Sequence, residues 1–143
     1  MLWLERLERV GLTPYLDAFP SSSPDLLNKA LEQFNAGLFW DCHETLEDLW
    51  RDTPYPLRHF YQGVIKIAVG FHHADGHNAK GSRNKLGEGI RLLRVFTPSF
   101  LGLDTEQLAT ETKRWLQQVN RRPRPDWANL DCQPRPQLLP MMG

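Results

Sequence analysis

The chain has 143 residues, of which 41% are hydrophobic and 24% charged, and its formal net charge is zero. This balance fits one globular domain with a buried core and excludes a disordered chain. It also argues against a polyanion as partner, so we expect no nucleic-acid binding. No apolar run reaches the roughly 20 residues that cross a bilayer, and the N-terminus lacks the apolar core of a signal peptide. We therefore expect a cytoplasmic protein without a membrane partner, and the two cysteines are expected to be free thiols.

Three regions follow one another along the chain. Residues 1–23 form an N-terminal extension, in which Gly11 separates two short amphipathic helical stretches. Residues 24–120 carry a helical bundle domain. Residues 121–143 form a tail in which five prolines precede residue 141, and this density predicts irregular structure throughout. We expect the tail to pack on the domain through Trp127 and Leu130.

The bundle domain shows helical spacing of apolar residues and no sustained period of two. Turn and capping residues divide it into helices expected over residues 24–34, 38–51, 55–74, 79–96 and 105–120. The segment 55–74 is apolar almost all round, so it should be the central helix. Asn78 is the expected N-cap of the next helix, and Asp104 or Thr105 of the last one. The predicted fold class is all-α, a compact helical bundle of five or six helices with an irregular proline-rich C-terminal tail.

The helix over residues 38–51 separates into distinct faces at 100° per residue. One stripe consists of Phe39, Cys42, Leu46 and Leu49, and the neighbouring stripe of Trp40, His43, Glu47 and Trp50. His43 and Glu47 therefore lean toward the interior, whereas Glu44 does not. We expect Trp40 and Trp50 to be core residues, with the Trp50 N–H hydrogen-bonded. The residues expected to face water are Asp41, Thr45, Asp48 and Asp52.

This helix carries a His-x-x-x-Glu-x-x-Trp motif. It begins within Phe34-Asn35-x-Gly37-x-Phe39-Trp40-x-Cys42-His43-Glu44-x-x-Glu47-x-x-Trp50-Arg51 and is followed by Tyr61-Gln62-Gly63-x-Ile65, His73 and Asn78-x-x-Gly81. The pattern resembles an uncharacterised family of small bacterial and archaeal helical proteins, a domain of unknown function, over about residues 26–108. The sequence departs from that family at Ser82, where the family has alanine, and at Lys66, where glutamine is common. The resemblance implies a helical bundle with a metal site at the His and Glu, and no established activity.

The short connection after residue 51 predicts that the two central helices pack antiparallel, with Trp50 facing Leu57. Gln62 then lies within a turn of His43 and Glu47, and Lys66 one turn further along. His73 would be roughly 14 Å from His43 along the helix at 1.5 Å per residue, too far for one ion to bind both. We expect His73 to form a second cluster with Asn35 and Asn78.

The residues of this cluster leave several interpretations open. His43 and Glu47 could form a buried hydrogen-bonded pair, bind a divalent metal such as zinc, manganese or iron, or act as an acid–base pair. A helical His–Glu pair supplies only two ligands, and His73 is a less favoured further one. Gln62, Trp50 and Lys66 are the candidate substrate-binding residues.

Two functions follow from these interpretations: a metal-dependent hydrolase with His43 and Glu47 as catalytic residues, or a non-catalytic helical binding module in which the cluster is structural. A small-molecule partner fits both, and a homodimer stays open. The Asn78-x-x-Gly81 motif is either an N-cap or an anion site. Arg121, Arg122 and Arg124 are interpreted as a solvated part of the tail, in preference to a nucleic-acid contact.

Overall fold

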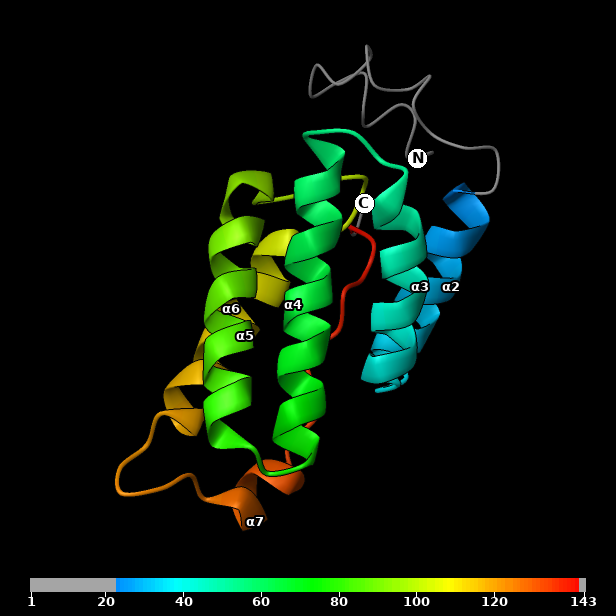
Figure 1. Ribbon diagram of the computed structural model, residues 1–143. Coiled ribbons are helices and arrows are strands. Elements are labelled where there is room, and N and C mark those ends of the chain that lie inside the picture. Colours follow the sequence, from blue (N-terminus) through cyan, green and yellow to red (C-terminus); the bar gives the residue numbers. More distant parts are fainter. Residues whose placement is uncertain (1–22, 142–143) are drawn as a thin grey trace.

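The computed structural model describes residues 23–141, which form helices joined by short connections (Figure 1). The α-helices of this part are α2 (Ser23–Asn35), α3 (Phe39–Arg51), α4 (Leu57–Asp75), α5 (Ala79–Leu93), α6 (Thr105–Val119) and α7 (Trp127–Asp131). The predicted all-α bundle is confirmed over these residues. The last turn of the helix expected over residues 79–96 is a separate 3-10 turn, Arg94–Phe96. The helical stretches expected before residue 23 lie outside the described residues.

Side-chain caps explain where three of the helices begin. The Asn78 side chain accepts a hydrogen bond from the Gly81 N–H at 3.0 Å, and Asp104 caps α6 in the same way at 3.0 Å. Both predicted caps are confirmed. Asp126 accepts from the Asn129 N–H at 3.2 Å and so starts α7. The tail is otherwise irregular as predicted, but its prolines leave room for this short helix, which the proline count wrongly excluded.

Helix α4 is the centre of the bundle, with α3 on one side and α5 on the other (Figure 1). Helices α4 and α5 approach closely at Gly70, where an added Cβ would lie 2.6 Å from Leu86 Cδ2. The prediction that this helix is the central and most apolar one is confirmed. Its buried residues are Leu57, Phe60, Tyr61, Gly63, Val64, Ile65, Ile67, Ala68, Gly70, Phe71 and Ala74.

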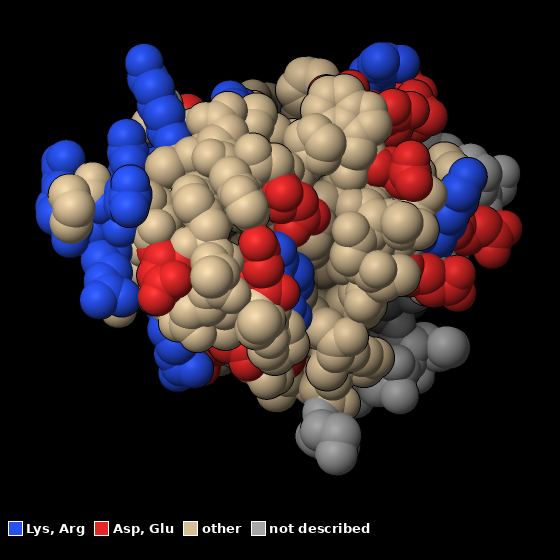
Figure 2. Space-filling model, turned by 90° about the horizontal axis from the view of Figure 1, so that it is seen from below, with Lys and Arg blue, Asp and Glu red and all other residues tan. Residues whose placement is uncertain are grey.

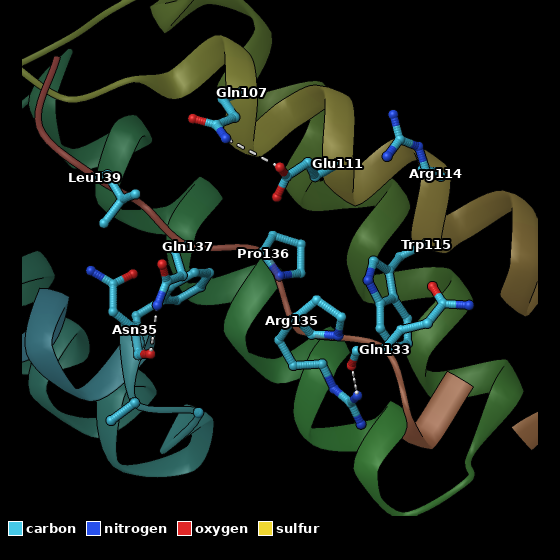
Figure 3. Close-up of a pocket in the computed structure, with 14 residues that line it drawn as sticks. Asn35, Gln107, Glu111, Arg114, Trp115, Gln133, Arg135, Pro136, Gln137 and Leu139 are labelled. Carbon is cyan, nitrogen blue, oxygen red and sulfur yellow. Dashed lines mark hydrogen bonds between the residues drawn. The ribbon is translucent and has the colours of Figure 1, made fainter. Parts of the chain in front are cut away.

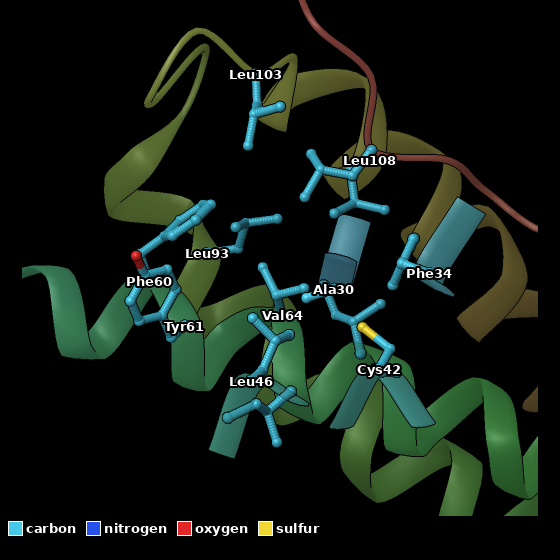
Figure 4. Close-up of a cluster of buried hydrophobic side chains, with 14 of the residues drawn as sticks. Ala30, Phe34, Cys42, Leu46, Phe60, Tyr61, Val64, Leu93, Leu103 and Leu108 are labelled. Atoms are coloured by element: carbon cyan, nitrogen blue, oxygen red, sulfur yellow. The ribbon is translucent and has the colours of Figure 1, made fainter. Parts of the chain in front are cut away.

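One hydrophobic core is shared by α2 to α6 and the tail (Figure 4). Burying each large aliphatic or aromatic side chain there contributes about 1.5–3 kcal/mol. The predicted stripe of α3 is confirmed, since Phe39, Cys42, Leu46 and Leu49 are all buried. Thr45 was wrongly expected to face water. Helix α2 covers that edge of α3, and the Thr45 hydroxyl donates to Gln33 Oε1 at 2.7 Å.

Residues 133–141, here called the C-terminal strap, complete the bundle. Leu138 is only 1% exposed and joins the core. The Asn35 side chain holds the backbone of Leu138 at both polar atoms, donating to its carbonyl at 3.1 Å and accepting from its N–H at 2.8 Å. Leu139 O and Met141 N bond the backbone of the loop before α6, both at 2.8 Å.

The strap is also anchored through Arg135. Its guanidinium pairs with Asp75 on α4 at 2.7 Å and lies over the Trp115 ring at 4.6 Å. Before the strap, Leu130 is fully buried and Trp127 packs against the core, as predicted. The tail is therefore an integral part of the fold.

Candidate functional site

His43 and Glu47 lie one turn apart on α3 and contact each other. His43 Nε2 is 3.0 Å from Glu47 Oε1, and the side chains are 14% and 40% exposed, respectively. The amphipathic pattern of α3 places them at the boundary between core and solvent, because the adjacent stripe is buried. Glu44 is exposed, as expected. The two side chains of the motif are therefore brought together at a half-buried edge.

Within residues 23–141, three side chains of α3 and α4 carry buried polar atoms without a hydrogen-bond partner, as do Ser82 on α5 and Thr112 on α6. His43 Nδ1, Trp50 Nε1 and the Tyr61 hydroxyl are buried and have no hydrogen-bond partner among the described residues. The bond predicted for the Trp50 N–H is therefore absent from this part of the chain. Burial raises the pKa of Tyr61, which keeps its hydroxyl protonated. We call the group formed by Trp40, His43, Glu47, Trp50 and Tyr61 the α3–α4 seam.

Trp40 does not lie in the core, where the stripe pattern placed it. Its side chain remains 46% exposed. The ring lies 4.6 Å from the His43 ring and 4.9 Å from the ring of His72 on α4. The turn between α2 and α3 leaves this end of the helix uncovered, which explains the error. His72 was not singled out from the sequence, because the predicted register, with Trp50 facing Leu57, places Trp40 opposite Ile67.

The predicted antiparallel packing of α3 and α4 is confirmed. The Arg58 guanidinium lies 4.1 Å from the centre of the Trp50 ring, one residue from the partner expected there. Lys66 Nζ pairs with Glu88 on α5 at 3.3 Å, so this lysine is directed toward α5. Gln62 is half-buried and lies one turn before Lys66 on the outer side of α4. A substrate-binding role for Gln62, Trp50 and Lys66 stays a prediction.

The ion pair with Lys66 lowers the pKa of the Glu88 carboxyl group. Desolvation raises its pKa, but the hydrogen bond from Lys66 and the charges of Lys66, Lys85 and Arg91 outweigh that effect. The net pKa of Glu88 therefore lies below its ordinary value. Lys66 is thus held by an acid of α5.

His73 forms a second cluster, as predicted, with Asn78. Asn78 Nδ2 lies 3.4 Å from His73 Nδ1, and a Cβ at Gly81 would lie 2.8 Å from His73 Cγ. The Asn78-x-x-Gly81 motif therefore has a structural explanation: Asn78 caps α5, and Gly81 leaves space for the imidazole. Asn35 was wrongly placed in this cluster, because its side chain holds the strap.

The metal ligands available near His43 are few. Residues 23–141 contain no group of three or more His, Cys, Asp or Glu side chains that could hold an ion. Both cysteines in this range are free. Burial raises the pKa of the Cys42 thiol to about 12, despite a hydrogen bond with the Phe34 backbone that lowers it. A buried thiol of this kind is a poor ligand, since metals bind the thiolate.

The helices and the surface charges bear on two further predictions, those on membranes and on nucleic acids. None of the helices within residues 23–141 is long and apolar enough to span a bilayer. Lys and Arg side chains gather on the side of α5 and α6, and acidic side chains dominate the side of α2 and α3 (Figure 2). Arg121, Arg122 and Arg124 are exposed, as the interpretation of a solvated tail requires. The absence of a nucleic-acid partner stays a prediction.

The fold and the seam define a small helical-bundle protein whose motif side chains meet on one helix edge. Residues 27–84 match the model of the family described as a domain of unknown function, DUF309. The chain is also 32% identical over 73 residues to the uncharacterized protein YpuF of Bacillus subtilis (strain 168), a match covering 49% of this chain and 42% of that protein. The chain thus spans less than half of that relative. The predicted resemblance to an uncharacterised family is confirmed.

Proposed function

We propose that the protein is a non-catalytic helical binding module, in which the His43–Glu47 pair is a structural pin that holds Trp40 at the surface. The observation that carries this proposal is the state of the imidazole. Nε2 is engaged by Glu47, and Nδ1 is buried. A general base needs a ring nitrogen that a substrate can reach, and His43 offers none in this arrangement.

Trp40 gives the module a surface group suited to recognition. The His43 ring packs against it, so the pin restricts the indole while leaving 46% of it exposed. Tryptophan is enriched among residues that anchor partners, because it combines a large apolar area with a hydrogen-bond donor. The role of the His43–Glu47 pair is then to orient Trp40, and no chemical step is assigned to it.

A metal-dependent hydrolase is the alternative, and one distance favours it. The 3.0 Å between Nε2 and Glu47 Oε1 would allow a zinc, manganese or iron ion to take both atoms as ligands. Catalytic zinc usually has three protein ligands. The third would have to come from outside residues 23–141 or from a second copy of the chain, because this part supplies no group of three.

Metal analysis combined with thermal unfolding distinguishes the two functions. We expect purified protein to contain no stoichiometric zinc, manganese or iron. We expect His43→Ala to lower the free energy of unfolding by about 1–3 kcal/mol, because packing and a hydrogen bond to a carboxylate are lost. Glu47→Gln should cost less, since an amide oxygen still accepts from Nε2–H. Stoichiometric metal that disappears in both variants, but persists in the exposed-site control Glu44→Gln, would replace the proposal with the hydrolase.

A further inference from the structure

A cavity of about 690 Å³ lies away from the α3–α4 seam, where the strap passes between the α2–α3 turn and α6 (Figure 3). Its volume falls within the range of small-molecule sites, roughly 300–1,000 Å³. Neither His43 nor Glu47 lines it. The cavity is therefore a second place at which a ligand could bind, independent of the proposed pin.

Two arginines line the cavity, and the charge of one of them, Arg135, is already paired. Arg135 donates to Asp75 at 2.7 and 3.2 Å and to two backbone carbonyls at 2.9 and 3.2 Å. Gln133 exchanges hydrogen bonds with Gln118 at 2.8 and 3.2 Å. The Arg114 guanidinium points away from the strap (Figure 3). Arg135 and Gln133 therefore present few open donors to the cavity, whereas Arg114 lines it without an ion pair among the described residues.

The open groups are mainly acceptors. Glu111 points into the gap between α6 and the strap (Figure 3) and accepts from Gln107 Nε2 at 3.2 Å, which leaves most of its acceptor capacity unused. Gln137 donates its amide to the Asn35 carbonyl at 3.2 Å, so its own side-chain oxygen remains an acceptor. Glu111 is the charged group that Figure 3 shows directed at this space.

The opposite wall contributes the partial negative charge of a helix C-terminus, because residues 35–37 line the cavity at the end of α2. The Asn35 carbonyl there already accepts from Gln137, and the Glu32, Gln33 and Phe34 carbonyls accept from backbone N–H groups of the turn. Phe34, Pro136 and Leu139 supply apolar surface beside these acceptors. From this arrangement we propose that the cavity binds an ammonium or guanidinium group on a short aliphatic stem, with Glu111 as its counter-ion.

Such a group could come from a free small molecule or from a lysine or arginine side chain of another protein. Two probes separate these sources: agmatine, which carries both cationic groups, and the blocked peptide acetyl-Gly-Arg-Gly-amide. Each is titrated into the ¹⁵N-labelled full chain, and amide shifts are followed at Gln107, Glu111 and Gln137. Tighter agmatine binding indicates a small-molecule ligand, and tighter peptide binding indicates a protein side chain. No saturable shift with either probe overturns the proposal.

Variants test the role of Glu111. We expect Glu111→Gln to weaken binding at least roughly ten-fold, because a charge-assisted hydrogen bond is lost. Glu106→Gln, an exposed position on the same helix, should leave the affinity unchanged. Gln137→Trp fills the cavity without changing its charge and should abolish binding. Equal affinity of Glu111→Gln and the unaltered protein, or binding of the dianion glutarate as tightly as agmatine, would refute the assignment.

Discussion

The α3–α4 seam and the C-terminal strap differ in whether their polar groups have hydrogen-bond partners. In the strap, Asn35 satisfies both backbone atoms of Leu138, and Arg135 has a carboxylate, two carbonyls and an aromatic ring as partners. In the seam, His43 Nδ1, Trp50 Nε1 and the Tyr61 hydroxyl have none among the described residues. The polar groups of the strap are therefore paired, whereas three buried polar atoms of the seam have no partner among the described residues.

The free-energy cost of a buried, unpaired polar group is large compared with the stability of a domain. A buried polar group without a partner costs about 1–3 kcal/mol, and a whole domain is stable by only about 5–15 kcal/mol. Residues that break local rules without an evident structural gain are expected at functional positions. The seam is therefore a candidate for function, whereas the paired groups of the strap hold the fold together and form one wall of the cavity.

Leu138→Ala should give the largest effect. This side chain is 1% exposed and lies in the core beside α2. Truncation removes buried apolar surface and leaves a cavity, so we expect a loss of about 2–5 kcal/mol in the free energy of unfolding, measured by urea denaturation. Leu139→Ala is the matched control. Leu139 is adjacent in sequence but 39% exposed, so its truncation should lower the free energy of unfolding far less. Equal losses in the two variants would show that the strap is not part of the core.

Tyr61→Phe should act in the opposite direction. The ring stays buried between α3 and the rest of the core, while the unpaired hydroxyl is removed. We expect the protein to become more stable by about 1 kcal/mol, seen as a higher Tm. Thr45→Val is the contrasting variant, because it removes a hydroxyl that does bond Gln33, and it should be destabilising. A destabilised Tyr61→Phe variant would mean that the hydroxyl does have a hydrogen-bond partner in solution.

The sequence predicted the seam and the strap unequally for a physical reason. Helix α3 follows a local period of 3.6 residues, so the adjacency of His43 and Glu47 needed only their spacing. The pairing of Asn35 with Leu138 joins residues 103 positions apart, and no local pattern specifies it. The exposure of Trp40 was missed for a similar reason, since the helical wheel shows direction but not which neighbour is absent. The motif was found from spacing, whereas its surroundings depended on tertiary contacts.

Ser82 shows how a departure from the family pattern gains a structural meaning. The family resemblance implies alanine at this position, and the Ser82 hydroxyl is buried without a partner among the described residues. Ser82 lies on the buried face of α5 with Leu86, Gly89 and Leu93. The sequence identified the departure from the family pattern. That the serine hydroxyl is buried without a partner could be seen only once the helices were packed together.

His73 extends the comparison to pH and should give the smallest effect. Burial lowers its pKa, and the positive charges of His72 and Lys85 lower it further. Because the folded pKa lies below the unfolded value of about 6.5, the folded state binds fewer protons. This contribution to stability is fully present above pH of about 6.5 and is lost as the pH falls through that value toward the folded pKa.

His73→Gln keeps a polar group beside Asn78 but cannot take up a proton in this range. We therefore expect the drop in Tm between pH 7.5 and pH 5.5 to be smaller in the variant than in the unaltered protein, with similar Tm values at pH 7.5. The Nδ1 atom of His73 has the Asn78 side chain as a neighbour, whereas the Nδ1 atom of His43 is buried without a partner among the described residues. If the pH dependence were identical in the two proteins, protonation of His73 would not be disfavoured by folding.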